Sequence, residues 1–389
     1  MSATNYTEFL AQTKLLTGSD SVYNLADELS KDSDSPLLIV TDKGIKNSGM
    51  LDQVLEVLQP LNLEVHIFDD VKPNPTIENT QSIYENHKSN QIKSIVALGG
   101  GSVIDTAKAV SILFTNDGPL DKYFGFDLYE NSPLPLYAIP TTVGTGSEGG
   151  NATVLTVEEN NNRFKKLIFG ADLFPKVAVL DGKLISGMPG HLVSSTGMDA
   201  LTHAIEGYVS LNGSVITDAL NLHAVKVIGD NILQAYSNTN NITAMNNMVQ
   251  ASCSTGIGMS NGGLGLVHGI SHAIGAKYDA PHGIVNAILL PYVLEYNWVS
   301  NPEKFSDIAN ALRVDTVRLT VEQAAKAGVA RVFELTEEVG IPSQLNEIGV
   351  EEKDIDTLAE MAINDDLYMQ PNPRSVSLND IKRILNKAL

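Results

Sequence analysis

The first half of the chain alternates short apolar runs with segments of helical pattern. Such alternation is typical of parallel strands joined by helical crossovers. Five apolar runs predict strands, at residues 36–42, 63–69, 94–99, 136–141 and 177–181. We therefore predict a parallel sheet built from βαβ units in this half.

After about Ser186 the pattern changes to long segments with helical periodicity. The predicted helices span residues 191–210, 214–236, 243–256, 283–296, 303–312, 321–339, 354–363 and 377–389. Turn-forming residues concentrate between Asp181 and Gly190, which indicates a domain boundary there. We predict an α/β N-terminal domain in residues 1–185 and an all-helical C-terminal domain in residues 186–389.

Length, charge and cysteine usage narrow the class of protein. A chain of 389 residues favours two domains. The 46 acidic against 26 basic residues argue against nucleic acid, because neutralising phosphates requires clustered Lys and Arg. The single cysteine, Cys253, cannot form an internal disulfide, and no apolar run is long enough to span a membrane. Residues 1–6 carry neither a basic cluster nor an apolar run, so we expect a cytoplasmic protein.

A glycine-rich turn follows the third predicted strand. Gly99, Gly100, Gly101 and Ser102 lead into a helical pattern that continues to Val110. We expect Ser102 to cap this helix together with Asp105, leaving first-turn amides to bind a pyrophosphate. A tight left-handed connection is the alternative, because such a turn alone is a weak signal and is not the common G-x-G-x-x-G fingerprint.

Asp42 ends the first predicted strand and is a candidate for contact with a ribose. A carboxylate there would accept hydrogen bonds from the ribose hydroxyls and repel a 2′-phosphate, which favours NAD over NADP. The residue precedes the glycines, whereas the acidic residue of the common fingerprint follows them. Taken alone, Asp42 is also a good candidate for a turn residue and helix cap.

One carboxylate and three imidazoles predict a metal site in the second half. Asp199 and His203 are four residues apart, so on a helix they share one face. His268 and His282 complete the set, which suits a divalent first-row metal and leaves a position open for substrate. Five of the eight histidines lie between residues 203 and 282, and this clustering favours a site.

The two other histidines of this stretch have different expectations. His272 lies one turn beyond His268 on the same face, where it could relay a proton or position a nicotinamide; a packed helix histidine is the alternative. His223 lies in an ordinary amphipathic pattern and is not expected to bind metal. The glycines around His268 are costly in a helix and indicate close approach of a cofactor or a partner helix.

Several stretches together resemble the iron-containing (group III) alcohol dehydrogenases over nearly the whole chain. The similarity is to the branch of lactaldehyde reductase and 1,3-propanediol dehydrogenase. The stretches are IVTDKGI at 39–45, KPNPT at 72–76, ALGGGSVIDTAKA at 97–109, IPTTVGTGSE at 139–148, TGMDALTHAIEGY at 196–208 and GLGLVHGISHAIGAKYDAPHGIVNAILLPYVLEYN at 263–297.

The resemblance implies a dehydroquinate synthase-like architecture, with a Rossmann-like dinucleotide-binding domain followed by the helical metal-binding domain. It implies metal ligation by Asp199, His203, His268 and His282, with His272 near the nicotinamide. The implied dinucleotide contacts are Asp42, Asn74, Gly100, Gly101, Ser102, Thr141, Thr142 and, of the pair at 165 and 166, Lys165.

The implied activity is metal-dependent, NAD(H)-linked hydride transfer between a small primary alcohol or diol and its aldehyde, in a homodimer. Fe(II) is the expected metal, and the ligand set also accommodates Zn(II) or Ni(II). A glycerol dehydrogenase, a dehydroquinate synthase-like lyase and a non-catalytic nucleotide-binding or assembly protein are the alternatives. The run VHGISHAIGAKYDAPHG points away from the first two, and the complete ligand set argues against the third.

Overall fold

A computed structural model describes residues 8–31, 35–159 and 162–389. Residues 1–6, on which the expected location rests, lie outside the described residues. The chain forms two compact units that are not contiguous in sequence. The sheet unit comprises Gln12–Gly197 and Asn231–Cys253. The helical unit comprises Met198–Asp230 and Ser254–Leu389, together with the described residues 8–11. The boundary expected after residue 185 stays a prediction.

A six-stranded parallel sheet forms the core of the sheet unit, with the strand order β1-β9-β6-β4-β2-β3. Its strands are β1 Lys14–Thr17, β2 Leu37–Val40, β3 Val65–Phe68, β4 Ser94–Gly99, β6 Leu136–Pro140 and β9 Val177–Leu180. All five predicted strands are confirmed. The edge strand β1 is an addition, because its four mostly exposed residues form no apolar run.

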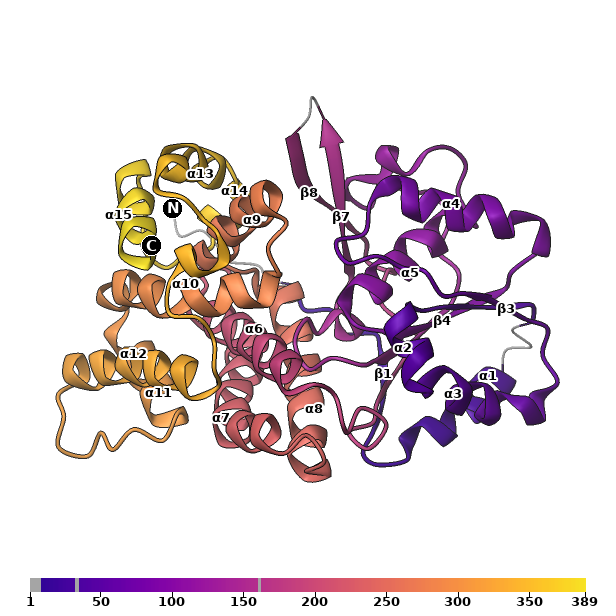
Figure 1. Ribbon diagram of the computed structural model, residues 1–389, viewed down its shortest axis with the longest axis horizontal. Helices are drawn as coiled ribbons and strands as arrows, with labels where there is room; N and C mark the ends of the chain where they lie inside the picture. The colour runs from indigo at the N-terminus through magenta and orange to yellow at the C-terminus, as the bar shows by residue number, and fades with distance from the viewer. Residues whose placement is uncertain (1–7, 32–34, 160–161) are drawn as a thin grey trace. The chain divides into compact units, whose positions relative to one another are not determined.

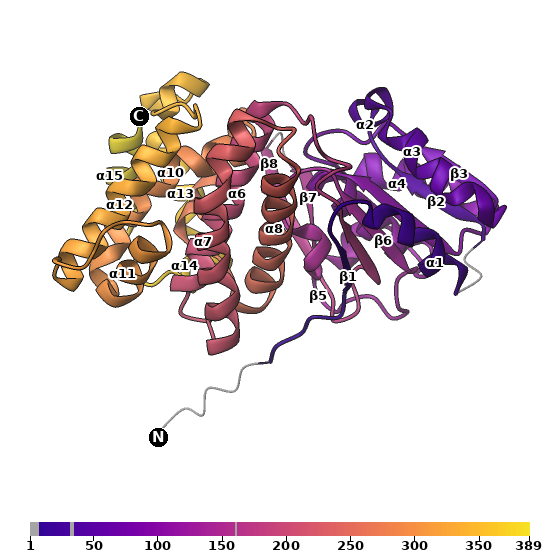
Figure 2. The same cartoon turned by 90° about the horizontal axis from the view of Figure 1, so that it is seen from below.

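Alternate residues of the central strands pack under helices on opposite faces. Leu37 and Ile39 lie in a core with α1 and α3, whereas Leu38 and Val40 lie in a core with α4 and α5 (Figures 1 and 2). Strands buried on both faces read as continuous apolar runs, which is why the sequence reveals them. The helices of this unit are α1 Leu25–Ser30, α2 Lys43–Ser48, α3 Met50–Leu58, α4 Ile77–His87 and α5 Gly101–Leu113.

The strand order reverses direction between β2 and β4. From β2 the chain moves outward to β3 and then returns to β4 on the other side of β2. Open parallel sheets bind ligands at such a switch point, outside the carboxyl ends of the strands. Asp42 follows β2 and Gly100 follows β4, so two of the predicted dinucleotide contacts lie at this edge. Without the edge strand β1, the order matches the flavodoxin-like arrangement rather than the common dinucleotide fold.

A second, three-stranded sheet extends the sheet unit and was missed from the sequence. It contains β5 Gly125–Phe126 and an antiparallel hairpin of β7 Ala152–Glu159 and β8 Asn162–Phe169. Thr156 of β7 pairs with Lys165 of β8. Polar residues interrupt both strands, so neither forms the apolar run by which the other strands were recognised.

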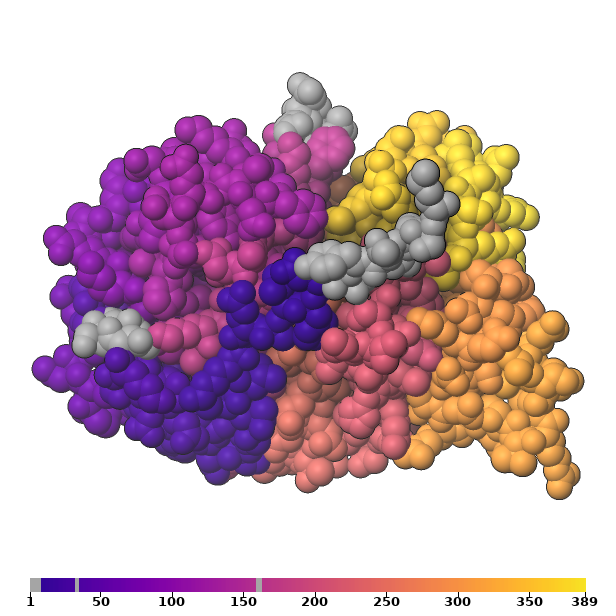
Figure 3. Space-filling model, turned by 180° about the vertical axis from the view of Figure 1, so that it is seen from behind, coloured from indigo at the N-terminus to yellow at the C-terminus, as the bar shows by residue number. Residues whose placement is uncertain are grey.

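The second half of the chain is helical, as predicted. Each expected helix is present with ends shifted by a few residues, and α9 and α14 are additional. The helices are α6 Gly190–Val209, α7 Val215–Ser237, α8 Ile242–Gly262, α9 Leu266–Tyr278, α10 His282–Asn297, α11 Pro302–Ala311, α12 Val321–Glu338, α13 Ile355–Ile363, α14 Asp366–Met369 and α15 Leu378–Ala388. The loop between α11 and α12, which exposes Val317, projects from the helical unit (Figure 3). Among the described residues no helix is both long and apolar enough to span a membrane.

Candidate metal centre and dinucleotide loop

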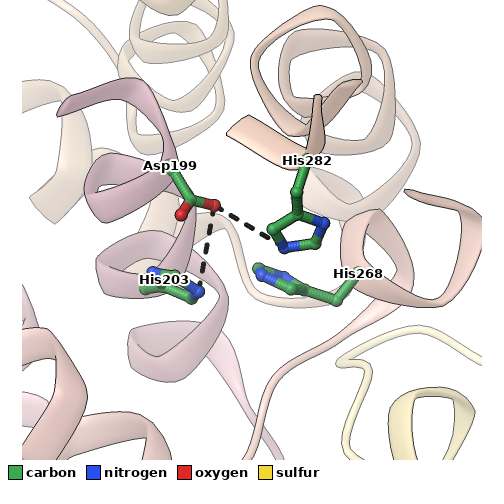
Figure 4. Close-up of side chains that lie close together, drawn as sticks. All are labelled: Asp199, His203, His268 and His282. Atoms are coloured by element: carbon green, nitrogen blue, oxygen red, sulfur yellow. Dashed lines mark ion pairs between the residues drawn. The ribbon is translucent and has the colours of Figure 1, made fainter. Parts of the chain in front are cut away.

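Four potential ligands from three helices converge within the helical unit. Asp199 and His203 lie one turn apart on α6, His268 lies on α9, and His282 is the first residue of α10. One ligand atom from each side chain lies within 4.8 Å of all the others. Asp199 Oδ1 is 3.9 Å from His203 Nε2 and 3.8 Å from His282 Nε2 (Figure 4). The four residues singled out from the sequence are therefore brought together.

The electrostatics of this cluster suit a cation. Desolvation lowers the pKa values of His268 and His282 well below 6.5, and neighbouring imidazoles reinforce the shift. Both rings are therefore neutral near pH 7, with nitrogen lone pairs available to a metal. Three imidazoles and one carboxylate form a donor set that fits a divalent first-row ion.

Glu206 orients one of the imidazoles. Its Oε2 lies 2.6 Å from His268 Nδ1, and its Oε1 accepts a hydrogen bond of 2.6 Å from the backbone N–H of Val267. A carboxylate on Nδ1 fixes the tautomer and directs the Nε2 lone pair of His268 toward the centre. Burial raises the pKa of Glu206 to about 7. Sequence reasoning missed this residue, although its spacing of three from His203 places both on one helix face.

Asn286 also reaches the centre and was missed. It lies one turn after His282 on α10, and its Nδ2 is 2.7 Å from Asp199 Oδ1. The same nitrogen is 3.1 Å from His268 Nε2 and 3.0 Å from His282 Nε2. Among the described residues its buried Oδ1 has no hydrogen-bond partner. The amide nitrogen of Asn286 thus contacts the lone pairs that a metal would use. Its unsatisfied oxygen could serve as a further metal ligand.

His272 lies beside the four ligands without joining them. Its ring centroid is 5.4 Å from that of His282 and 6.3 Å from that of His268. The ring of Tyr368, on α14, meets His272 edge to face at 4.8 Å. This packing fits both expectations for His272, so its role near a nicotinamide stays a prediction. His223 is exposed on α7 and lies outside the cluster.

A partner helix explains one of the glycines in α9. A Cβ atom on Gly269 would lie 2.4 Å from Met369 Cε and 3.2 Å from Tyr368 Cβ. The absence of a side chain at this position lets α14 approach α9 and brings Tyr368 against His272. At Gly275 an added Cβ would meet nothing within 4 Å, and nothing in the structure explains a glycine there.

The expected cap of the glycine-loop helix is wrong. Helix α5 begins at Gly101 with Gly100 as its N-cap, and no side chain caps it. Ser102 lies inside the first turn because the helix starts earlier than expected. Asp105 instead accepts hydrogen bonds from Ser147 Oγ at 2.5 Å and from the N–H of Val154 at 3.1 Å. The amides of Gly101 and Ser102 belong to the helical turn that lacks intrahelical acceptors, and they remain available to an anion.

The absence of side chains at Gly100 and Gly101 allows a neighbouring segment to pack closely against the glycine loop. A Cβ atom on Gly101 would lie 2.5 Å from Thr145 Cγ2, and one on Gly100 would lie 3.0 Å from Thr142 Cγ2. The N–H of Thr141 donates to the carbonyl of Gly99 at 3.0 Å. The segment after β6 therefore lies directly against the loop after β4.

The remaining predicted dinucleotide contacts fall into two places. Asp42 Oδ1 accepts a hydrogen bond of 2.9 Å from the N–H of Ile45, so this residue does cap α2, and contact with a ribose stays a prediction. Lys165 Nζ donates to Asn74 Oδ1 at 2.7 Å and to Thr156 Oγ1 at 3.0 Å. The hairpin thus brings Lys165 to Asn74, two residues that are distant in sequence.

Comparisons with known proteins agree with this arrangement. Residues 12–182 match the family profile described as iron-containing alcohol dehydrogenase, and residues 193–389 match the profile of the C-terminal part of the Fe-containing alcohol dehydrogenase family. The chain is 38% identical to the 1,3-propanediol dehydrogenase of Klebsiella pneumoniae over 353 residues, which cover 90% of each chain. It is 37% identical to the lactaldehyde reductase of Escherichia coli K12 over 95% of this chain and 96% of that one.

Two further similarities concern a cofactor and the fold. The NAD-dependent methanol dehydrogenase of Bacillus methanolicus is 34% identical over 98% of this chain and 100% of its own length. The crystal structure of a 1,3-propanediol oxidoreductase superposes with a TM-score of 0.95 at 36% identity, covering 99% of this chain and 100% of that one. The resemblance seen in the sequence motifs thus extends over the whole fold.

Proposed function

The chain belongs to the iron-containing alcohol dehydrogenase family, and we propose that it interconverts a small primary alcohol or diol and its aldehyde with NAD(H) and a divalent metal ion. The observation that carries the proposal is the convergence of Asp199, His203, His268 and His282. Fe(II) is the proposed metal, and Zn(II) or Ni(II) fits the same donors. We also propose a homodimer located in the cytoplasm.

The metal centre supports this chemistry through the residues that hold it. A divalent ion bound there would act as a Lewis acid toward the alcohol or carbonyl oxygen. Asp199 would offset part of the cation's charge. Glu206 holds the proton on His268 Nδ1, so that the lone pair of Nε2 is free to bind the metal. We assign His272 to positioning the nicotinamide, since it lies beside His268 and His282 without belonging to the ligand set.

The dinucleotide contacts follow from the carboxyl ends of the parallel strands. The amides of Gly101 and Ser102 would bind the pyrophosphate, with Gly100 allowing the backbone to approach. Asp42 would accept hydrogen bonds from the adenosine ribose and disfavour a 2′-phosphate, which favours NAD(H). The further contacts that we propose are Thr141, Thr142, Asn74 and Lys165.

The substrate class is proposed to be small and polar. The relatives are named for 1,3-propanediol, lactaldehyde and methanol, which are short molecules that share a primary alcohol or an aldehyde. We propose a substrate of this size for the present chain.

The test is an NADH-oxidation assay on metal-reconstituted protein. Protein loaded anaerobically with Fe(II), and separately with Zn(II) or Ni(II), is given NADH and a panel of short aldehydes while absorbance at the nicotinamide band is followed. His268→Ala is expected to abolish metal-dependent turnover and retain NADH binding. His223→Ala, which changes an exposed histidine on α7, is the matched control and should turn over normally.

Two results would contradict the proposal. Absence of aldehyde-dependent NADH oxidation with every metal would favour a non-catalytic nucleotide-binding or assembly protein. A preference for glycerol over primary alcohols in the reverse direction would favour a glycerol dehydrogenase.

A further inference from the structure

A buried ammonium group lies beneath the glycine loop. Lys108, on α5, is fully buried. Its Nζ donates to the backbone carbonyls of Ser147, Gly150 and Ala152 at 2.8, 2.7 and 2.8 Å. An ammonium has three protons, and these three carbonyls use all of them. Burial lowers the pKa of Lys108 to about 8, so the group is mainly charged at pH 7.

Asp105 lies one turn before Lys108 on α5 and also binds the segment that contains Ser147, Gly150 and Ala152. Its carboxylate accepts from Ser147 Oγ and from the N–H of Val154, and its backbone carbonyl accepts from Thr153 Oγ1 at 2.8 Å. Desolvation raises the pKa of Asp105, and the charge of Lys108 opposes this shift. The buried charge of Lys108 and the partly buried charge of Asp105 therefore attach residues 147–154 to α5.

The attached segment continues directly from the wall of the predicted pyrophosphate site. Thr142 and Thr145 lie against Gly100 and Gly101, just before the residues that Lys108 holds. Residues 142–145, which lead into the attached segment, are also held by the side chain of Thr196, whose Oγ1 accepts from the N–H of Val143 at 3.4 Å. Helix α5 thus presents the amides of its first turn to the predicted pyrophosphate site. Through Asp105 and Lys108, in its second and third turns, it also binds the segment that borders this site.

We propose that Lys108 and Asp105 are positioning residues that lock the segment 142–152 against the amides of Gly101 and Ser102 and thereby set the affinity for the dinucleotide pyrophosphate. The inference rests on the proposed function, because it requires a dinucleotide at this loop. Lys108 is fully buried and Asp105 partly buried, and each uses its charged group on the segment, so we expect neither side chain to contact the ligand. A wall fixed in advance spares the ligand the entropy cost of ordering it.

The test compares binding with turnover in Lys108→Met, which keeps most of the apolar stem of the side chain and removes its three donors. We expect the Kd for NADH to rise at least about tenfold, the effect of losing a charge-assisted hydrogen bond. ADP-ribose, which keeps the pyrophosphate and lacks the nicotinamide, should lose affinity by the same factor. KM for NADH should rise far more than kcat falls, and the bound metal per chain should not change. Lys122→Met, at an exposed lysine of the same unit, is the matched control.

Ser147→Ala provides a second, milder variant, since it removes one hydrogen bond to Asp105 and leaves the three bonds of Lys108. We expect it to raise the Kd for NADH in the same direction and by less, and it decides the matter if Lys108→Met does not fold. Folded variants that bind NADH and ADP-ribose with unchanged affinity would overturn the inference alone. Wild-type protein that binds neither ligand would overturn the proposed function and this inference with it.

Discussion

Glu206 shows how a residue outside the ligand set can control the metal centre. Its two carboxylate oxygens serve two donors, the N–H of Val267 and Nδ1 of His268. In Glu206→Gln one of these donors faces an amide NH₂, or His268 adopts the tautomer that carries its proton on Nε2. We expect metal affinity to fall about 10- to 100-fold, measured by competition with a chelating dye.

A milder change beside another ligand is the control for Glu206→Gln. Ser271→Ala removes only a hydroxyl 3.2 Å from His282 Nδ1 and should weaken metal binding less. Equal metal affinity in wild type and a folded Glu206→Gln would show that the orientation of His268 does not depend on this carboxylate.

From the buried carboxyl of Glu148 we expect the stability of the sheet unit to depend on pH. Burial raises its pKa from 4.5 to about 7. The folded protein then keeps a proton that the unfolded chain releases, so this contribution is complete below pH 4.5 and is lost as pH rises through 7. The full loss is on the order of 3 kcal/mol for such a shift. The opposite contribution of Lys108 arises only above about pH 8.

Glu148→Gln should remove this loss, because an amide stays neutral. Between pH 5 and 7.5 the thermal midpoint of the wild type should decline relative to that of the variant. Glu56→Gln, on the exposed face of α3, should follow the wild type. Parallel curves for the wild type and Glu148→Gln would show that this carboxyl is not the source of the dependence.

Individual residues differ in how far the sequence could reveal them. Asp199 and His203 were predictable because helical spacing alone puts them on one face. Asn286 lies one turn after His282, so the same spacing could have indicated it. Tyr368 contacts the centre only through the packing of α14 against α9, which no local spacing reports. Asp105 was assigned to a cap because three residues separate it from Ser102, yet its carboxylate is used by a segment more than forty residues later.

In helix α9 the neighbouring helix α14 restricts one glycine position. Gly269→Ala would displace the flexible end of Met369 and press on Tyr368 Cβ, and we expect a destabilisation of about 1 kcal/mol from overpacking. Gly275→Ala, on the same helix, meets nothing and should stabilise by roughly 0.5–1 kcal/mol through helix propensity. Thermal denaturation of the two variants measures the contrast. Equal effects of both substitutions would mean that α14 does not pack closely at Gly269.

Elements were predictable where burial is uniform along them. Strand β4 is buried at all six positions, so it reads as one apolar run. Strand β8 includes Arg163, Lys165 and Lys166, whose charges hide the strand pattern until its pairing with β7 is known. The edge strand β1 has four residues and pairs only with β9, a partner that lies far away in sequence.

At the scale of the molecule, the sequence indicated the layers and left their order open. Five apolar runs imply a parallel sheet whatever their arrangement, so the class of fold followed from pattern alone. The order β1-β9-β6-β4-β2-β3 depends on which helices cover which face, and this decides that Asp42 and Gly100 share a switch point. The division into units that each draw on separate stretches of sequence likewise follows from tertiary packing.

Metal removal should therefore affect the helical unit selectively. The four ligands join α6, α9 and α10, so an ion that binds only the folded state would stabilise these helices together, by about 4 kcal/mol when its concentration is a thousand times Kd. Treatment with a chelator should accelerate hydrogen exchange in these three helices and leave β2 and β4 protected. The His268→Ala variant, which already lacks a ligand, should show little response. Faster exchange in the central strands, or none in α6 and α10, would contradict a metal centre that acts as a local bridge between helices.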